Sequence, residues 1–403
     1  MNMTDQGKNS EVIRQQNRLS VLRVVREKRV ISRVDIAHIT GLKQATITNI
    51  VNELREKDYV KDAGMIQGNR GRRVKGLMLN DEKLRILVSR ITSEYYAVGI
   101  YDLYGICIKV EKHFWEKDEN FLRRLDAVRQ VLEHYIDVYG NGKEILGAGI
   151  VIDGSISNMD QRFSSYQKGN IESFLEQYFN VQIKIPVYVE NMSNMSAFFE
   201  WNRLTLNRSD IHTLVCLSIS YSIDCAIIFN GKFLKGKNGK IGHFGHVSID
   251  MNGPVCDCGN RGCIKNYISV DAVKKQCMSL KKKYPDMPLD ESCNIRDIIR
   301  AYNQGEAYAE ELYEDVAEKL SVVLVNLINL FNPEKIIFGD EIPNSEKFLE
   351  MTKRYIRTKL PERRYQRVTV DVFREERKTE KDVGMRGMCL FVTNEQLKKM
   401  ELN

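Results

Sequence analysis

Apolar positions recur with a helical period in the first 57 residues of the chain. In residues 17–28 and again in residues 44–56, apolar side chains stand three or four positions apart, separated by polar ones. The predicted inward-facing residues are Leu19, Leu22 and Val25 in the first stretch and Ile47, Ile50, Val51 and Leu54 in the other. Between these stretches, Ser32 is a suitable N-cap for a short helix, and Gly41 ends that helix. The pattern therefore predicts three helices, the last two joined by a glycine-containing turn.

A strand pair is expected after these helices. Tyr59 and Val60 begin the first strand, and Val74–Leu79 is the returning strand. The segment between them is rich in glycine and arginine, and glycine permits the tight turn that a hairpin requires. Helices followed by a hairpin are typical of a winged helix-turn-helix, which we expect to occupy residues 1–80.

Beyond about residue 82, the pattern changes to short strands mixed with helices. The expected strands are 84–91, 96–101, 105–113, 145–152, 186–189, 213–219, 223–229 and 335–338. The expected helices are 119–139, 170–180, 192–203, 266–283, 306–331 and 346–358. This mixture indicates an α/β body over residues 82–403. We expect two lobes of similar design, lobe one at about 82–190 plus the C-terminal segment and lobe two at about 191–380.

Composition agrees with this organisation. A chain of 403 residues is too long to fold around one compact core. Its content of 43% hydrophobic and 29% charged residues is ordinary for a globular protein. No apolar run reaches the roughly 18 residues that a membrane span needs, and Met1–Ser10 lacks the apolar stretch of a secretion signal. We therefore expect a cytoplasmic protein, whose nine cysteines are reduced thiols or metal ligands.

Positive charge is concentrated at the N-terminus. Residues 1–80 contain 16 Lys and Arg against 8 Asp and Glu, whereas the other 323 residues contain 45 against 46. A solvated basic surface is one explanation, and a three-helix protein-interaction module with a basic loop is another. The pattern of three helices, the hairpin that follows them and the local positive charge together favour double-stranded DNA as the partner.

Specific side chains fit that partner. The second helix of a helix-turn-helix enters the major groove, where short polar groups reach base edges. The residues predicted to face the groove are Gln44, Ala45, Thr46, Thr48, Asn49 and Asn52, with the small Ala45 suited to a thymine methyl. Arg70, Arg72 and Arg73 suit the negative potential of a minor groove. Arg33, Lys43 and Lys75 are predicted to contact phosphates.

A cysteine-rich segment in the body predicts a metal site. His246, Cys256, Cys258 and Cys263 make a Cys3His set, which suits tetrahedral zinc and leaves no open position for catalysis. We expect a structural Zn²⁺ ion that holds the surrounding loop. A redox or chance cluster is the alternative, because Cys-x-Cys is tighter than the usual finger spacing.

The run 242–246, Gly-His-Phe-Gly-His, with the run 256–263, Cys-Asp-Cys-Gly-Asn-Arg-Gly-Cys, resembles the signature of the ROK family of repressors and sugar kinases. The head and body together resemble its repressor branch, which includes xylose-operon and N-acetylglucosamine repressors. The resemblance covers essentially the whole chain. It implies two actin-like lobes with a sugar cleft between them, and a homodimer or a dimer of dimers.

Three features of the family's kinases are missing at the matching positions. The first phosphate loop reads Arg90-Ile91-Thr92-Ser93-Glu94, with arginine in place of aspartate. The second, residues 218–224, has no glycine to admit ATP. Met192 replaces the aspartate that acts as base, and a thioether cannot accept a proton from a sugar hydroxyl. The resemblance therefore implies a body without kinase activity.

The resemblance also suggests an effector site with fewer carboxylates than in the kinases. The residues matching the family's sugar site are Gly154, Asn191, His243, His246 and Asp257, with His243 standing where the family has glutamate. We expect a repressor of sugar-utilisation genes, for example those for xylose, that binds a palindromic, AT-rich operator and is released by a carbohydrate. Two alternatives stay open: a constitutive DNA-binding dimer whose body senses nothing, and an active kinase with a DNA-binding appendage.

Overall fold

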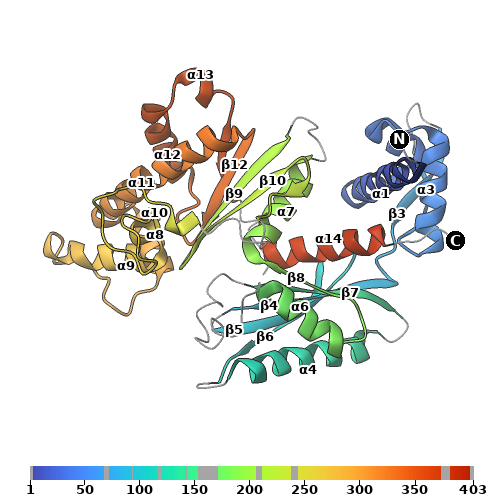
Figure 1. Cartoon of the computed structure of the whole chain (residues 1–403), viewed down its shortest axis with the longest axis horizontal. Helices are drawn as coiled ribbons and strands as arrows, with labels where there is room; N and C mark the ends of the chain where they lie inside the picture. The colour runs from blue at the N-terminus through green and yellow to red at the C-terminus, as the bar shows by residue number, and fades with distance from the viewer. Residues whose placement is uncertain are drawn as a thin grey trace. The chain divides into compact units, whose positions relative to one another are not determined.

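The computed structural model describes residues 3–67, 72–92, 94–116, 120–140, 143–152, 171–205, 211–236, 244–373 and 382–399. The chain divides into two compact units (Figure 1). The first comprises residues 1–208 and 381–403, and the second residues 209–380. Within the described ranges, no helix has the length and apolar character required to cross a bilayer.

The N-terminal part of the first unit is a winged helix-turn-helix, as predicted. Its helices are α1 (Met3–Lys28), α2 (Arg33–Thr40) and α3 (Gln44–Glu56). Its three-stranded sheet has the order β1 (Ile31–Ser32), β3 (Arg73–Leu79), β2 (Val60–Gln67). The Ser32 hydroxyl caps α2 by accepting from the Asp35 amide, and Gly41 ends it at φ 70°. We call residues 3–80 the head.

Helix α1 begins well before residue 17, where the apolar pattern placed its start. Its early turns are mostly polar and so lack the periodic signal. An ion pair from Arg14 to Glu53 of α3 supports this part of the helix, and Arg18, one turn later, pairs with the same carboxylate. Arg18 is almost fully buried.

The rest of the first unit contains a five-stranded sheet of order β6-β5-β4-β7-β8. The strands are β4 (Leu84–Ile91), β5 (Tyr95–Tyr101), β6 (Cys107–Phe114), β7 (Glu144–Ile152) and β8 (Val187–Asn191). Neighbours β4, β5 and β6 are antiparallel, whereas β4, β7 and β8 are parallel. Helices α4 (Phe121–Tyr139) and α6 (Ile171–Gln182) bury one face of this sheet.

The other face carries α7 (Met192–Thr205) and α14 (Val383–Lys398). Helix α14 approaches β7 so closely that a Cβ added to Gly149 would lie 2.3 Å from Cγ of Met388. A glycine is therefore required at this point of the strand.

The second unit repeats the same sheet order, β11-β10-β9-β12-β13, with the same pattern of antiparallel and parallel pairs. Its strands are β9 (Thr213–Ile219), β10 (Ile223–Phe229), β11 (Lys232–Phe233), β12 (Lys335–Asp340) and β13 (Thr369–Val372). Its helices are α8 (Lys265–Ile268), α9 (Val270–Ser279), α10 (Ile295–Gln304), α11 (Ala307–Phe331), α12 (Glu346–Lys359) and α13 (Glu362–Tyr365). The expected α/β body with two similar lobes is confirmed.

The predicted helix 266–283 is wrong in one respect, because it is interrupted at Ser269. That residue has an extended backbone, and its hydroxyl accepts from the Ala272 amide to cap α9. A serine that can satisfy a free amide starts a new helix more readily than it continues an old one. Helices α10 and α14 and strand β13 were not predicted.

The head shares its hydrophobic core with the sheet that follows it. The core formed by α1, α2 and α3 also contains Leu84, Leu103, Tyr104 and Leu397. Leu103 and Leu397 are completely buried, and the Tyr104 hydroxyl accepts a hydrogen bond from the Leu79 amide at 3.1 Å. The head is therefore continuous with the rest of the first compact unit.

Candidate DNA interface and metal centre

The solvent side of α3 carries the short polar groups that the sequence predicted to face DNA. Four of them, Gln44, Ala45, Asn49 and Asn52, are exposed, and Thr46 and Thr48 are half-buried. The Thr48 hydroxyl donates to the Gln44 carbonyl at 3.0 Å, so its free lone pairs act as acceptors. Lys43 is exposed immediately before the first turn. Whether each of these residues contacts DNA remains a prediction.

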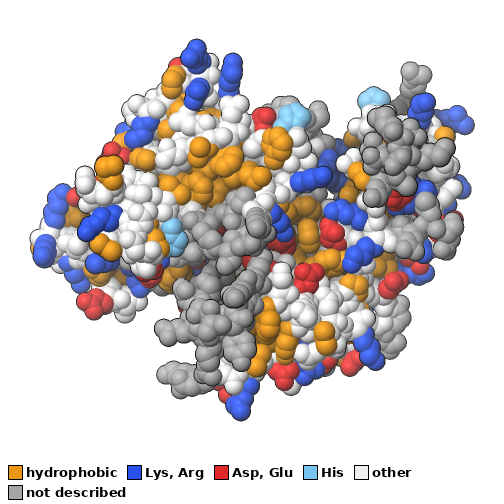
Figure 2. Space-filling view, viewed as in Figure 1, with side chains coloured by type: hydrophobic (Ala, Val, Ile, Leu, Met, Phe, Trp, Pro, Cys, Tyr) orange, Lys and Arg blue, Asp and Glu red, His pale blue; other side chains and the backbone are white. Residues whose placement is uncertain are grey.

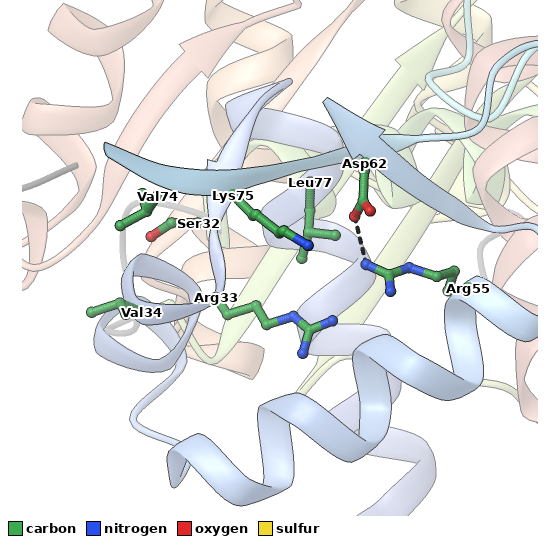
Figure 3. Close-up of a pocket in the computed structure, with 8 residues that line it drawn as sticks. All are labelled: Ser32, Arg33, Val34, Arg55, Asp62, Val74, Lys75 and Leu77. Carbon is green, nitrogen blue, oxygen red and sulfur yellow. Dashed lines mark hydrogen bonds and ion pairs between the residues drawn. The ribbon is translucent and has the colours of Figure 1, made fainter. Parts of the chain in front are cut away.

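A hollow lies beside this face, between α2, the end of α3 and the strands of the wing (Figure 3). Its lining is Ser32, Arg33, Val34, Arg55, Asp62, Val74, Lys75 and Leu77. Figure 3 shows the side chains of Arg33 and Lys75 extending into it from α2 and from the wing. Neither side chain forms an ion pair with a carboxylate of the described residues, whereas Arg55 is paired with Asp62. The hollow therefore offers two uncompensated cations to an anion.

The wing supplies further positive charge. Arg72 and Arg73 are exposed at the start of β3. The predicted minor-groove residue Arg70 lies outside the described residues. Arg33 also donates from Nη2 to Oδ1 of Asn52 at 3.3 Å, which links a predicted phosphate contact to a predicted base contact.

Several basic residues of the head hold the fold together instead. Arg14 and Arg18 bind Glu53, Arg55 binds Asp62, and Lys61 binds Asp81 and Glu82. The count of 16 basic residues in this N-terminal part therefore overstates the number of cations available to DNA, which the sequence count alone did not reveal.

Three arginines at the C-terminal end of the first helix, Arg23 and Arg26 within α1 and Arg29 just after it, contact the rest of the first unit. Arg23 donates to the hydroxyl and carbonyl of Thr205, at the end of α7. Arg26 donates to the Leu103 carbonyl at 3.0 Å, and burial lowers its pKa to about 10, so it stays protonated at neutral pH. The guanidinium of Arg29 lies 4.2 Å above the ring of Tyr104. These three arginines therefore fix the head to the body.

The second unit brings together the four predicted metal ligands. The nitrogen and sulfur ligand atoms of His246, Cys256, Cys258 and Cys263 all lie within 4.8 Å of one another. Sγ of Cys256 lies 3.5 Å from Nδ1 of His246, and Sγ of Cys258 lies 3.7 Å from Sγ of Cys263. Tetrahedral zinc, with Zn–S bonds of about 2.3 Å, separates two sulfurs by about 3.8 Å. The spacing therefore fits a tetrahedral ion.

Backbone geometry explains the glycines around these cysteines. Gly259 and Gly262 both have positive φ, and a Cβ on Gly262 would lie 1.7 Å from the Asp250 carbonyl oxygen. The Cys256 amide donates to the Asn260 carbonyl at 2.8 Å, which closes the turn between the cysteines. These contacts curl the chain so that the thiols converge.

The predicted effector residues are distributed over both units. In the first, Asn191 ends β8, and its side-chain oxygen accepts from the Asn194 amide at 2.8 Å. In the second, Asp257 is paired with Lys265 at 2.7 Å, and this hydrogen bond lowers the pKa of Asp257 to about 2. Gly154 and His243 lie outside the described residues. Sequence reasoning missed Lys265, because nothing in the sequence signals that it pairs with Asp257.

The positions that match the kinase machinery are occupied by internal contacts. Arg90 forms an ion pair with Asp382, the N-cap of α14, at 2.6 Å. The sulfur of Met192 packs against Gly384, where an added Cβ would lie 1.9 Å from it. The turn between β9 and β10 is stabilised by a hydrogen bond from the Val270 amide to the Ser220 carbonyl.

Fold and site together define a two-lobed protein with a DNA-binding type of head and a Cys3His cluster. Residues 111–395 match the model of the ROK family. The chain is 28% identical to the xylose repressor of Caldicellulosiruptor bescii, over 86% of this chain and 89% of that one. It is 24% identical to the transcriptional dual regulator NagC of Escherichia coli, over 85% and 84%.

Solved structures agree on the fold. The crystal structure of a ROK family transcriptional regulator, a homologue of the E. coli MLC protein, matches with a TM-score of 0.76 and 24% identity, over 96% of this chain and 98% of that one. A ROK hexokinase from Thermus thermophilus matches with a TM-score of 0.56 and 21% identity, over 76% and 97%. The actin-like architecture of the body is thereby confirmed. This chain belongs to the ROK family.

Proposed function

We propose that this protein is a sequence-specific DNA-binding repressor of sugar-utilisation genes, relieved by a carbohydrate effector and without kinase activity. The observation that carries the proposal is the hollow beside α3, where Arg33 and Lys75 are held without acidic partners among the described residues, next to an exposed polar helix face. Relatives over most of the chain are named xylose repressor and NagC. The proposal also assigns residues 1–80 to the DNA-binding winged helix-turn-helix and residues 82–403 to the body that resembles a sugar kinase.

Gel shifts with the native upstream region test the DNA half of the proposal. Arg33→Gln combined with Lys75→Gln is expected to weaken binding to all sequences alike, because phosphate contacts position a protein without reading bases. Asn49→Ala is expected to reduce the preference for the operator over other duplexes. Unaltered binding by both variants would contradict the interface.

The absence of phosphoryl transfer is supported by the internal contacts of Arg90 and Met192. An arginine bound to Asp382 and a thioether packed on Gly384 leave neither a carboxylate for magnesium nor a base for the sugar hydroxyl at these two positions. A coupled assay for ADP release over a panel of sugars tests this. Turnover above background would support the alternative of an active kinase.

The effector is proposed to act through α7 and α14. The chain leaves the first unit after α7 and returns to it before α14. Both helices contact α1, since Arg23 bonds to Thr205 and Gln15 donates to the Lys398 carbonyl. A ligand that favours one arrangement of these helices would shift the equilibrium between two orientations of the head. The size of the shift is set by the difference in the ligand's affinity for the two states.

Asn191, His246 and Asp257, together with Gly154 and His243, are the proposed effector residues. Thermal shift with D-xylose and N-acetylglucosamine separates this reading from a constitutive dimer, because a ligand that binds only the folded state raises Tm. No shift with any sugar would favour the constitutive alternative. Light scattering tests the proposed homodimer or dimer of dimers.

The Cys3His cluster is proposed to hold one structural Zn²⁺, bound by His246, Cys256, Cys258 and Cys263. All four tetrahedral positions would then be filled by protein, so the ion would stabilise the loop without activating water. Metal analysis of the purified protein tests the identity and stoichiometry of the ion. A metal-free cluster that forms disulfides would support the redox alternative.

A further inference from the structure

The body contains a second concentration of positive charge, remote in sequence from the head. Residues 346–367 hold 8 Lys and Arg against 3 Asp and Glu, although residues 81–403 as a whole are nearly balanced. Without this segment, the remaining body has 37 basic and 43 acidic residues. Figure 2 shows Lys and Arg side chains gathered over α12 and α13.

The first part of this segment is neutralised by neighbouring carboxylates. Lys347 pairs with Glu310 of α11, Arg354 with Glu314 at 3.0 Å, and Lys353 pairs within its own helix. The last turn of α12 and the residues after it are different. Their exposed cations have no ion pair with a carboxylate of the described residues; they are Arg357, Lys359, Arg363, Arg364 and Arg367, which we call the α12–α13 patch.

Neutral partners orient three of these five cations. Arg357 lies 4.8 Å above the ring of Tyr365, and Lys359 lies 5.1 Å from the ring of Tyr355. Arg364 donates from Nη1 to the side-chain oxygen of Asn329 at 2.6 Å. Aromatic faces and amides hold a cation in place without cancelling its charge.

The arrangement fits a chain of anions better than one small anion. Four of the five cations are arginines, whose planar guanidinium binds phosphate oxygens in pairs. They are spread along the end of one helix and a second short helix instead of converging on a point. Duplex DNA presents one negative charge for about every 1.7 Å of its axis, so it can engage several separate cations at once.

We propose that the α12–α13 patch is a second DNA-contacting surface, which binds the phosphate backbone without reading sequence. The choice of duplex DNA as its occupant rests on the proposed function of the head. The patch would add affinity that depends on salt and not on the operator.

The test uses full-length protein and a long duplex containing the native upstream region, with affinity measured over a range of salt concentrations. The triple variant Arg357→Gln, Arg363→Gln, Arg367→Gln removes three charges and leaves the Arg364–Asn329 bond intact. The matched control is Lys275→Gln, Lys281→Gln, Lys282→Gln, which removes three exposed charges from the same unit. Substitution of the same three arginines by lysine keeps the charge.

The patch variant is expected to flatten the dependence of log affinity on log salt. The expected change in slope is about 0.9 for each phosphate that the protein no longer neutralises, and so up to about 2.7 for three. The control is expected to keep the wild-type slope, and the lysine variant to retain most of it.

Equal slopes for patch and control variants would overturn the patch while leaving the function of the head standing. Patch-dependent binding to phosphatidylserine vesicles with an unchanged DNA slope would also overturn it. If wild-type protein binds no DNA, both proposals fail.

Discussion

Substitution of Leu397 by alanine tests whether the head and the body share one core. Leu397 lies near the end of α14, is completely buried, and packs in the same cluster as Val21, Ile47 and Leu54 of the head. Removing a fully buried leucine side chain costs about 2–5 kcal/mol. Since α14 packs against α1 and the cluster is otherwise made mostly of head residues, the loss is expected in the head, more than 340 residues away in sequence.

Hydrogen exchange measured by mass spectrometry, together with urea unfolding, can locate this loss. Even at about 2 kcal/mol, amides that exchange only when the shared core opens are expected to exchange roughly thirtyfold faster. The acceleration is expected in residues 21–25 and 47–54. Leu132→Ala provides the control, because Leu132 is equally buried but belongs to the core beneath α4.

The two variants distinguish a shared core from an independent head. With a shared core, Leu397→Ala accelerates exchange in α1 and α3 more than Leu132→Ala does at the same overall loss of stability. If the head were an independent domain, Leu397→Ala would leave its exchange at the wild-type rate. That second result would refute the reasoning.

Four other outcomes are expected. Cys258→Ser is expected to lower bound zinc below one equivalent and to reduce Tm, as measured by metal analysis and calorimetry; full metal content would contradict the Cys3His site. Burial acts to raise the pKa of Glu53, but hydrogen bonds from Arg14 and Arg18 outweigh it and hold the pKa below its ordinary value of 4.5. The stabilisation by Glu53 is therefore present above about pH 4.5 and disappears as the pH falls through the lower folded pKa, so urea unfolding should find Glu53→Gln less stable than wild type at pH 7 but not in strong acid. Met192→Asp is expected to produce no sugar kinase activity in a coupled assay, because Arg90 and the glycine-free turn remain; phosphorylated sugar would show that Met192 alone blocks the reaction. Arg23→Ala is expected to leave DNA affinity in the absence of sugar nearly unchanged but to reduce the change that an effector produces, as measured by fluorescence anisotropy; an undiminished response would exclude the contact with Thr205 from the coupling.

The elements that the sequence predicted correctly are those with strong local signals. The buried strands β4, β9 and β10 are short segments rich in apolar residues, and α3 has a clear apolar face, so their limits agree closely with the structure. Local caps also act over a few residues, as at Ser32. Such features are determined by residues that are close in sequence, so the sequence alone is enough to predict them.

Of the missed helices, α10 carries local signals that could have predicted it, a capping box at Asn294 and a C-cap at Gly305, whereas α14 depends on tertiary contacts. Helix α14 carries Gly384 and Gly387, which disfavour an isolated helix, and it is buried on several sides, so it has no polar stripe. Gly387 is required because a Cβ there would lie 1.9 Å from the Met195 carbonyl oxygen. A glycine that breaks a helix pattern in sequence here allows close helix packing in space.

The candidate site divides in the same way. The cysteine spacing predicted the cluster that the structure brings together, since three of its members lie within eight residues. The pairing of Lys265 with Asp257 and the use of Arg23, Arg26 and Arg29 inside the fold follow from the packing of distant segments. Charge counting cannot separate cations that face a ligand from cations that bind another part of the same chain.

The turn that carries Leu103 and Tyr104 has a consequence for building hybrid regulators. This turn lies between β5 and β6, yet it completes the interior of the N-terminal segment, with Tyr104 beneath Arg29 and against the end of β3. In a chimaera joined at residue 80, the head of one protein would pack against the β5–β6 turn of another. Exchange of operator preference between relatives should therefore succeed when this turn and the end of α14 are transferred together with the head. It should also succeed when only residues on the outer face of α3 are exchanged.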